Sequence, residues 1–242
     1  MTQLSGKTAV ITGASQGIGL AIAHAFAAAG ARLAVAARSA DKVQQAAAEL
    51  APHGGAVLAV STDVTDERQV ATLFDQVDQQ FGRIDLLVNN AGAFDGGPLD
   101  QLPLAAWRKV IDTNLTGPFL CTQAALKRMK RQQSGRIINI GSISAQRVRP
   151  ESAAYSASKH GLWGLTQVAA LEGRAYGVTC CCLHPGNTMV ERRHTDKPED
   201  AEPMIAAESI AQVALLMATL PEDAEMLEAI VLPRGQQYVG RG

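Results

Sequence analysis

Tyr155 and Lys159 are the two residues of this chain whose types and spacing most directly suggest chemistry. On a helix, side chains four residues apart lie on the same face. The ammonium of a lysine favours the phenolate and lowers the pKa of a neighbouring tyrosine from its ordinary value of about 10. Such a tyrosine can give up a proton near neutral pH. Because many helices carry this pair by chance, the interpretation depends on what surrounds it.

A glycine-punctuated turn near the N-terminus provides that context. Gly13, Gly17 and Gly19 follow an apolar run at residues 7–12 and open an alanine-rich helical pattern. Glycines permit a tight turn and a close backbone approach to a pyrophosphate, while the helix N-terminus supplies N–H donors. A purely structural turn is the alternative, but the position between the first strand and the first helix favours a dinucleotide site.

The end of the second predicted strand indicates which dinucleotide binds. NAD-specific folds carry an acid there, which binds the ribose 2′-hydroxyl. This chain has Arg38 and Ser39 instead. A guanidinium can hold a 2′-phosphate through paired hydrogen bonds, so we expect a preference for NADPH. The alternative is a solvated surface arginine.

Strands and helices alternate along the whole chain. Predicted strands lie at residues 7–12, 32–37, 56–60, 84–88, 136–140, 178–183 and 227–232. Predicted helices lie at residues 17–30, 41–51, 66–81, 104–113, 115–131, 155–176 and 208–220. This alternation predicts an α/β fold with a doubly wound, seven-stranded parallel sheet flanked by helices on both faces. We see no linker, so residues 1–242 are expected to form a single domain of the Rossmann type.

With these elements in place, the chain resembles the short-chain dehydrogenase/reductase family. Asp63-Val64 after the third strand matches the family's adenine-contacting pair, and Asn89-Asn90-Ala91-Gly92 after the fourth matches its NNAG motif. His184-Pro185-Gly186 after the sixth strand resembles its PG motif, which lines the nicotinamide. The acid could otherwise cap a helix and the asparagines could make a turn. Both motifs nevertheless arrive in order at the expected strand ends.

The resemblance extends to the family's catalytic tetrad, which Asn114, Ser142, Tyr155 and Lys159 match in order and with near-standard spacing. It implies that Tyr155 protonates the substrate oxygen as hydride arrives from the nicotinamide, or deprotonates an alcohol in reverse. It implies that Ser142 hydrogen-bonds the same oxygen and that Lys159 binds the nicotinamide ribose. Asn114 would hold a water through its backbone in a helix distortion. Ser144 is a neighbouring competitor for the serine role.

The resemblance also implies a set of residues that bind NADP(H). They are Gly13, Ser15, Gln16, Gly17, Ile18, Gly19, Arg38, Ser39, Asp63, Val64, Asn90, Ala91, Gly92, Tyr155, Lys159, Pro185, Gly186 and Thr188. The chain departs from the family at one of these positions. The family usually has a threonine five residues after the proline, where this chain has Val190, and Thr188 is the expected substitute.

Residues 187–206 break the alternation with mixed charges and prolines. They follow the carboxyl end of a late strand, where ligands bind in open α/β sheets, so we expect a substrate loop or lid. The alternative is a solvated excursion with no role. Residues 232–242 lack the Asp-Gly-Gly ending common among acyl-carrier reductases, which leaves the substrate class open.

The overall composition restricts the class of partner. The formal net charge is −1 and the basic stretches carry no interleaved aromatics, so we expect no nucleic acid and no membrane surface. The polar start at residues 1–6 leads us to expect no signal peptide, and the apolar stretch at residues 21–37 is too short and too interrupted to span a bilayer. Cys180, Cys181 and Cys182 fit a buried strand better than a disulfide framework or a metal site, so no metal is expected. Reduced thiols indicate the cytoplasm.

The leading hypothesis is an NADPH-dependent carbonyl reductase that converts a ketone or aldehyde to an alcohol. The alternative is a catalytically quiet NADP(H)-binding regulatory protein on the same fold, but such a binder needs no tuned phenol. A relative that catalyses elimination or dehalogenation is disfavoured, because the lysine and the glycines are all present. The resemblance also implies a homotetramer or homodimer, with the helices at residues 115–131 and 155–176 packed across a two-fold axis.

Overall fold

Seven parallel strands form one sheet in the order β3-β2-β1-β4-β5-β6-β7. The computed structural model describes residues 3–190 and 202–238. The strands are β1 (Thr8–Thr12), β2 (Arg32–Ala37), β3 (Val57–Ser61), β4 (Leu86–Asn89), β5 (Gly135–Ile140), β6 (Val178–Pro185) and β7 (Glu228–Val231). The order reverses between β1 and β4, and open α/β sheets bind ligands at such a switch point. The predicted doubly wound, seven-stranded sheet is confirmed.

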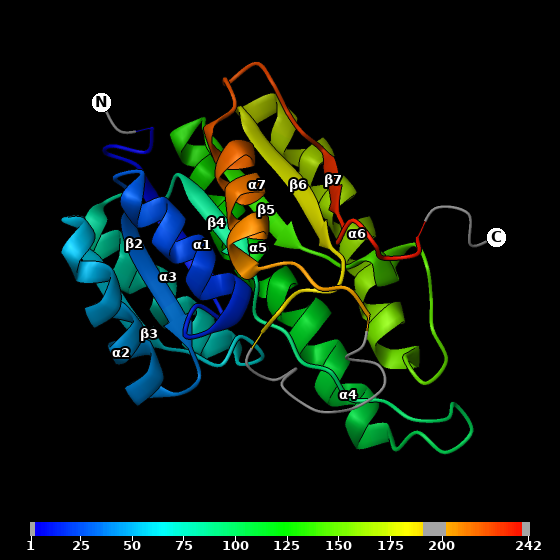
Figure 1. Ribbon diagram of the computed structural model, residues 1–242. Helices are drawn as coiled ribbons and strands as arrows, with labels where there is room; N and C mark the ends of the chain where they lie inside the picture. Colours follow the sequence, from blue (N-terminus) through cyan, green and yellow to red (C-terminus); the bar gives the residue numbers. More distant parts are fainter. Residues whose placement is uncertain (1–2, 191–201, 239–242) are drawn as a thin grey trace.

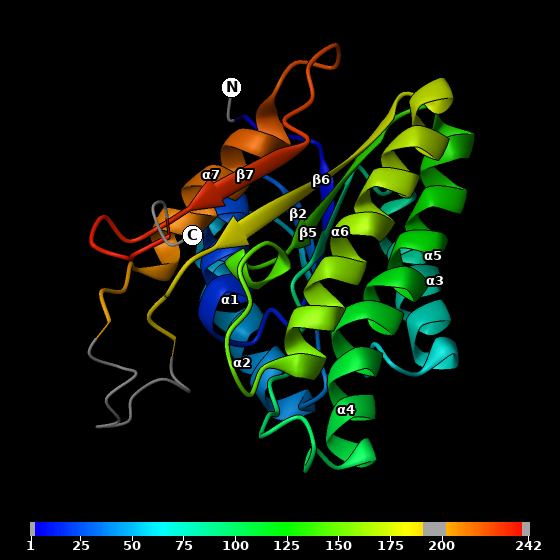
Figure 2. The same cartoon turned by 90° about the vertical axis from the view of Figure 1, so that its right-hand side faces the viewer.

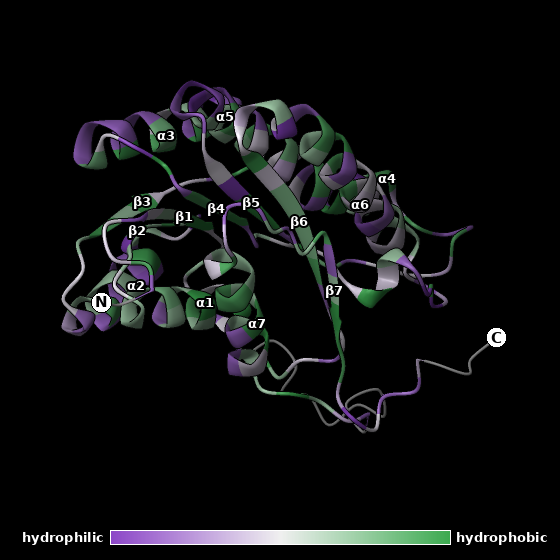
Figure 3. Ribbon diagram, turned by 90° about the horizontal axis from the view of Figure 1, so that it is seen from above, coloured by the Kyte–Doolittle hydropathy of each residue, from purple (hydrophilic) through white to green (hydrophobic). Residues whose placement is uncertain are grey.

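Helices cover both faces of this sheet (Figures 1 and 3). They are α1 (Gly17–Ala28), α2 (Ala40–Leu50), α3 (Glu67–Phe81), α4 (Leu104–Ile111), α5 (Gly117–Gln132), α6 (Ala153–Gly173) and α7 (Ala207–Thr219). Figure 2 shows α1, α2 and α7 on one side of the strands and α3, α5 and α6 on the other. Each layer buries its own apolar cluster against the sheet.

The central strands are buried on both faces, as their nearly continuous apolar sequences predict. In β1, Ile11 packs into the cluster beneath α1 and α7, whereas Val10 packs into the cluster beneath α3 and α5. Both side chains are fully buried. Each such side chain contributes roughly 1.5–3 kcal/mol to stability relative to an exposed one. The two clusters together hold the strands in register.

Local signals fix the ends of the helices. Asp66 caps α3, because its side chain accepts the backbone N–H groups of Arg68 at 2.9 Å and Gln69 at 3.1 Å. The hydrogen bonds from Gln69 hold the pKa of the Asp66 carboxyl below its usual range. The helix ends where Gly82 adopts φ +74° in the left-handed region, which a residue without a Cβ enters most readily.

The predicted boundaries differ from the observed ones by a few residues at several elements. The strand predicted at 84–88 runs over Leu86–Asn89. Asp85, just before β4, accepts a hydrogen bond from the Thr8 backbone with its side chain. The break predicted after residue 113 is a π-helical turn, η2 (Asp112–Thr116), that joins α4 directly to α5. The helix predicted at 155–176 begins at Ala153 and ends in a separate 3₁₀ turn, η4 (Arg174–Tyr176).

The four cysteines are free and buried. Cys180, Cys181 and Cys182 lie in β6, as their apolar neighbours predict. Burial raises the pKa of the Cys181 and Cys182 thiols to about 12, so both are neutral at physiological pH. In the described part of the chain, no cluster of three or more metal-ligating side chains occurs, and no helix has the length and hydropathy needed to span a bilayer.

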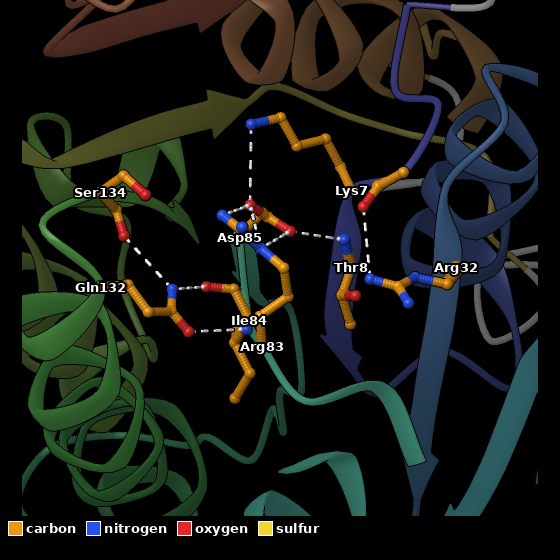
Figure 4. Close-up of polar contacts among 9 residues, drawn as sticks. Lys7, Thr8, Arg32, Arg83, Ile84, Asp85, Gln132 and Ser134 are labelled. Carbon is orange, nitrogen blue, oxygen red and sulfur yellow. Dashed lines mark hydrogen bonds and ion pairs between the residues drawn. The ribbon is translucent and has the colours of Figure 1, made fainter.

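Asp85 joins the amino ends of β1 and β4 (Figure 4). The carboxylate is only 5% exposed, accepts the backbone N–H of Thr8 at 2.8 Å, and pairs with Arg83 at 2.6 Å. Gln132 closes the same end by bonding both the N–H and the carbonyl of Ile84. A buried carboxylate is tolerated when it is paired and hydrogen-bonded in this way.

Replacing Asp85 with alanine is expected to lower the free energy of unfolding by about 2 to 3 kcal/mol, because the Thr8 N–H is left buried without an acceptor. The matched control is Asp75→Ala, which removes an exposed carboxylate from an ion pair with Arg128. That control should cost less than about 1 kcal/mol. Urea unfolding of both variants measures the difference, and equal losses would contradict the role given to Asp85.

Candidate active site

The candidate residues gather where the carboxyl ends of the parallel strands meet. Thr12, Asn89, Ile140 and Pro185 end β1, β4, β5 and β6. Figure 1 shows the arrowheads of β5, β6 and β7 pointing to the same edge of the sheet. Residues far apart in sequence therefore lie together at this edge.

The glycine turn after β1 is locked to the segment after β4. Thr12 Oγ1 accepts the backbone N–H groups of Asn90 at 3.1 Å and Ala91 at 3.2 Å. The Asn90 side-chain amide donates in return to the carbonyls of Thr12 and Gly13. A Cβ on Gly13 would lie 2.7 Å from the Ala91 Cα, so only glycine permits this approach. The NNAG motif thus shapes the turn that is predicted to bind pyrophosphate.

The N-terminus of α1 faces this edge and fits an anion. Gln16 is the N-cap with extended backbone, and within the described residues its side chain makes no cap hydrogen bond. Gly13 and Gly17 have φ of +63° and +55°, conformations that L side chains rarely adopt. Ser15, Gln16, Gly17 and Ile18 are half-buried, and Gly19 is buried beneath Asn90. Uncapped N–H donors at a helix start provide a suitable place for a pyrophosphate.

Arg38 and Ser39 follow β2 at the rim of the same edge. Both are exposed, and the Arg38 carbonyl accepts a hydrogen bond from the Ser61 hydroxyl at 3.0 Å. Ser39 caps α2 by accepting the Lys42 N–H at 3.4 Å. Among the described residues, no carboxylate forms an ion pair with the Arg38 guanidinium, so the cation stays available for an anion.

Asp63 and Val64 lie after β3 in different surroundings. The Asp63 carboxylate accepts the backbone N–H and the hydroxyl of Thr65, at 3.0 and 2.8 Å. Val64 is buried against Gly117 at the start of α5. Asp66, and not Asp63, caps α3, so the capping alternative for Asp63 is wrong.

Asn114 sits in the π-helical turn η2, where the helix widens. Its side-chain oxygen accepts the Ala93 N–H at 2.7 Å, and its amide donates to the Ala93 carbonyl at 2.9 Å and to the Ser158 hydroxyl at 3.2 Å. These bonds tie η2 to the segment after β4 and to α6. The predicted helix distortion at Asn114 is therefore present, and π turns frequently occur at functional sites.

Tyr155 and Lys159 lie one turn apart near the start of α6. The Lys159 Nζ is 5.6 Å from the centroid of the Tyr155 ring and donates to the Ile140 carbonyl at 2.8 Å. The lysine is only 5% exposed, so its charge acts in a medium of low dielectric constant. The Phe94 ring contacts Tyr155 edge-on, with centroids 5.4 Å apart. Phe94 matches none of the motifs in the sequence, so its contact with Tyr155 is a feature that only the structure reveals.

Ser142 lies two residues beyond β5 and caps the 3₁₀ turn η3 (Ile143–Ala145). Its Oγ accepts the backbone N–H of Ser144 at 3.1 Å, which leaves the hydroxyl proton to donate elsewhere. Ser144 is almost fully buried, at 2% exposure, whereas Ser142 retains 8%. The greater exposure of Ser142 favours it over Ser144 as the serine that meets a substrate.

The segment after β6 runs back along the glycine turn. Thr188 is buried and its hydroxyl donates to the Gly186 carbonyl at 3.1 Å, whereas the Val190 side chain lies over Gly17. Met189 and Ile205 are joined by a hydrogen bond of 2.8 Å, so both ends of the predicted lid at 187–206 run side by side. Residues 191–201 of that lid lie outside the described residues, and the lid stays a prediction.

His184 is a further functional candidate, for which the sequence gives no role beyond its place in the His184-Pro185-Gly186 motif. Its buried imidazole lies against the Ser142 backbone, with Nδ1 2.9 Å from the carbonyl oxygen and 3.3 Å from the nitrogen. Glu228 of β7 approaches the other ring nitrogen, Nε2, at 3.3 Å. The only sequence signal was its place directly before the Pro185-Gly186 pair at the end of a buried strand.

Comparison with known proteins agrees with this geometry. Residues 7–201 match the family model of the short chain dehydrogenases. A 3-oxoacyl-[acyl-carrier-protein] reductase of Synechocystis sp. is 43% identical over 187 residues, which cover 77% of this chain and 76% of that protein. An uncharacterized oxidoreductase of Staphylococcus aureus (strain MRSA252) is 35% identical over 233 residues, or 96% of this chain and 100% of the relative.

Solved structures give the same result. A short-chain type dehydrogenase/reductase from Mycobacterium marinum superposes with a TM-score of 0.88 at 33% identity, over 95% of both chains. A metagenomic short-chain oxidoreductase in complex with NADP superposes with a TM-score of 0.83 at 34% identity, over 96% of this chain and 98% of the other. The sheet order, the motifs at its carboxyl edge and these relatives lead to one conclusion: the chain belongs to the short-chain dehydrogenase/reductase family and is an oxidoreductase.

Proposed function

We propose that the protein reduces a ketone or aldehyde to an alcohol with NADPH as the reductant. The observation that carries this proposal is the arrangement of Tyr155 above the buried Lys159 ammonium, next to the strand end that leads to Ser142. An ammonium 5.6 Å from a phenol ring favours the phenolate. The tyrosine is thereby prepared to give its proton to a substrate oxygen.

The residues of the site divide the work of the reaction. Tyr155 donates a proton to the carbonyl oxygen as negative charge develops there. Ser142 donates a hydrogen bond to the same oxygen and stabilises the developing alkoxide. Lys159 holds the positive charge near the phenol. Asn114 anchors η2 and the segment after β4, and its backbone would hold the water that returns protons.

The chain offers a consistent set of residues to hold NADP(H). Gly13, Gly17 and the open start of α1 would hold the pyrophosphate, and Asp63 and Val64 would contact the adenine. Arg38 and Ser39 would bind the 2′-phosphate, while Pro185, Gly186 and Thr188 would line the nicotinamide. When bound, the nicotinamide supplies the hydride. A related structure was solved with NADP, which supports this assignment.

Replacing Tyr155 with phenylalanine is expected to lower kcat by about 10²- to 10⁴-fold, because the proton donor is lost while ring packing is retained. The dissociation constant for NADPH should stay within about twofold, as measured by quenching of tryptophan fluorescence. Tyr176→Phe is the matched control, since that phenol lies in η4 at the far end of α6. Substantial reductase activity in Tyr155→Phe would reject the role of Tyr155.

Replacing Arg38 with aspartate is expected to weaken NADPH binding by about tenfold or more, because a cation that pairs with phosphate becomes an anion that repels it. Binding of NADH, which lacks the phosphate, should not weaken. Titrating the variant and the wild type with each nucleotide gives the dissociation constants that test this preference. An equal loss of affinity for NADPH and NADH would contradict the proposed preference for NADPH.

We also propose a homotetramer or homodimer in the cytoplasm. The free, buried cysteines fit a reducing compartment. On α6, Val168 and Leu171 are 51% and 64% exposed, and Phe119 of α5 is 45% exposed, so these helices present apolar surface. Exposed patches of this kind mark interaction sites. A second copy of this chain would cover them across a two-fold axis.

Replacing Leu171 with aspartate is expected to reduce the mass of the assembly in light scattering, because a charge is placed inside the proposed interface. Asp223, exposed in the loop after α7, offers Asp223→Asn as a control that should keep the wild-type mass. A wild-type protein with the mass of one chain at micromolar concentration would remove the claim.

A further inference from the structure

His184 is a buried titratable residue that the proposed reaction does not use. Its imidazole packs edge-on against Trp163 of α6, with ring centroids 5.9 Å apart. A Cβ on Gly141 would lie only 2.6 Å from Nδ1, so the glycine at the end of β5 makes room for the ring. The absence of that side chain brings the imidazole into contact with the backbone of Ser142.

The strand register brings Glu228 to the other side of the ring. Cys182 of β6 pairs with Glu228 of β7. Because side chains alternate along a strand, His184, two residues after Cys182, lies on the same face of the sheet as Glu228. The carboxylate oxygen Oε1 is 3.3 Å from the imidazole Nε2, which is fully buried and has no hydrogen-bond partner among the described residues.

Two tautomers of a neutral His184 are consistent with these distances. With the proton on Nδ1, the ring donates to the Ser142 carbonyl, but a lone pair on Nε2 then faces the carboxylate. With the proton on Nε2, the N–H lies beside the carboxylate and Nδ1 accepts the Ser142 N–H, while the Nδ1 lone pair lies 2.9 Å from the Ser142 carbonyl oxygen. Each tautomer leaves one ring lone pair against an oxygen atom. Electrostatics favours the second arrangement, because the full negative charge of the carboxylate repels a lone pair more strongly than the carbonyl dipole does.

A chain of hydrogen bonds fixes the carboxylate in this role. Gln146, which follows η3, donates its side-chain amide to Glu228 Oε1, and its oxygen accepts the hydroxyl of Tyr238. The Arg147 guanidinium lies over the Tyr238 ring, 5.5 Å from its centroid. Since the Gln146 oxygen accepts the Tyr238 hydroxyl, the Gln146 amide hydrogens face Glu228, and the carboxylate accepts one of them.

We propose that Glu228 holds His184 in the tautomer protonated on Nε2, so that Nδ1 accepts the backbone N–H of Ser142 and positions this serine for reaction. His184 and Glu228 are thus positioning residues, and Gln146 and Tyr238 orient the carboxylate. The proposal rests on the proposed function, because it concerns how Ser142 is held for it. In this arrangement Ser142 donates its N–H to the ring, and the ring N–H lies beside Glu228. Tyr238 donates to Gln146, which donates to the same carboxylate.

The electrostatic surroundings keep His184 in its neutral form. Burial lowers the pKa of the imidazole, and the Lys159 ammonium on α6 acts in the same direction. The Ser142 backbone and the Glu228 carboxylate oppose this effect. Cys182, on the same strand, is neutral because burial raises its pKa to about 12. A neutral ring has a single N–H, so the choice of tautomer decides which backbone group of Ser142 it can bind.

The first test is ¹⁵N NMR of the wild-type protein labelled at histidine, with His184→Gln used to assign the signals. We expect a protonated Nε2 and an unprotonated Nδ1 for His184. In Glu228→Gln, which keeps a side chain of the same shape, the tautomer should shift toward Nδ1–H. Protonation on Nδ1 in the wild type, or an unchanged tautomer in the variant, would overturn the proposal.

The second test measures whether Glu228 and His184 affect the reaction through Ser142. Glu228→Gln should lower kcat by about tenfold, the effect of losing about one well-placed hydrogen bond, with unchanged affinity for NADPH. Glu225→Gln is the matched control, because that carboxylate likewise contacts β6, accepting the backbone N–H of Cys180 at 3.1 Å, but at the amino end of the strand. It should keep the wild-type kcat.

A double-mutant cycle with Ser142→Ala separates this proposal from the proposed function. If Glu228 acts through the serine, Glu228→Gln should lower kcat in the wild type and have no further effect in Ser142→Ala. A full tenfold loss in both backgrounds would show a general structural effect and overturn the positioning role. A wild-type kcat in Ser142→Ala would instead contradict the role of the serine itself in the proposed function.

Discussion

Parallel strand pairing is the constraint on which the rest of this structure depends. It places the carboxyl ends of all strands at one edge, so that residues far apart in the sequence, such as Thr12 and Asn90, become neighbours. Thr12, at the end of β1, uses one hydroxyl oxygen to accept two N–H groups of the segment after β4. That contact closes the switch point and shapes the glycine turn. The opposite edge is closed by Asp85, whose buried carboxylate joins the amino ends of the same two strands.

Around this edge, the site consists mainly of buried polar groups that are held by backbone atoms. The Lys159 ammonium donates to the Ile140 carbonyl, Asn114 bonds both backbone groups of Ala93, and His184 contacts both backbone groups of Ser142. Buried polar groups are costly unless they are paired, so these contacts also restrict where each side chain can lie. The same bonds that stabilise the carboxyl edge would therefore also preorganise it for the proposed reaction.

The sheet and most residues of the candidate site could be predicted from the sequence, because both depend on short-range sequence patterns. The strand–helix alternation predicts the sheet, and the position of each motif at a strand end predicts which residues gather. Register and long-range side-chain contacts have no such local pattern. Nothing in the sequence places Glu228 beside His184, since the two lie 44 positions apart with the helix α7 between them. Likewise, Phe94 could be assigned to a loop, but its edge contact with Tyr155 depends on how that loop folds back.

The central claim is that this edge of the sheet carries out NADPH-linked reduction of a carbonyl group. The most direct test follows the loss of NADPH and NADH absorbance by the purified protein against β-keto esters, diketones, aldehydes, quinones and steroids. The account predicts fast turnover with at least one of these groups, and a higher kcat/KM with NADPH than with NADH. Tight binding of NADPH without turnover across the panel would contradict it and would indicate a nucleotide-binding regulatory protein instead.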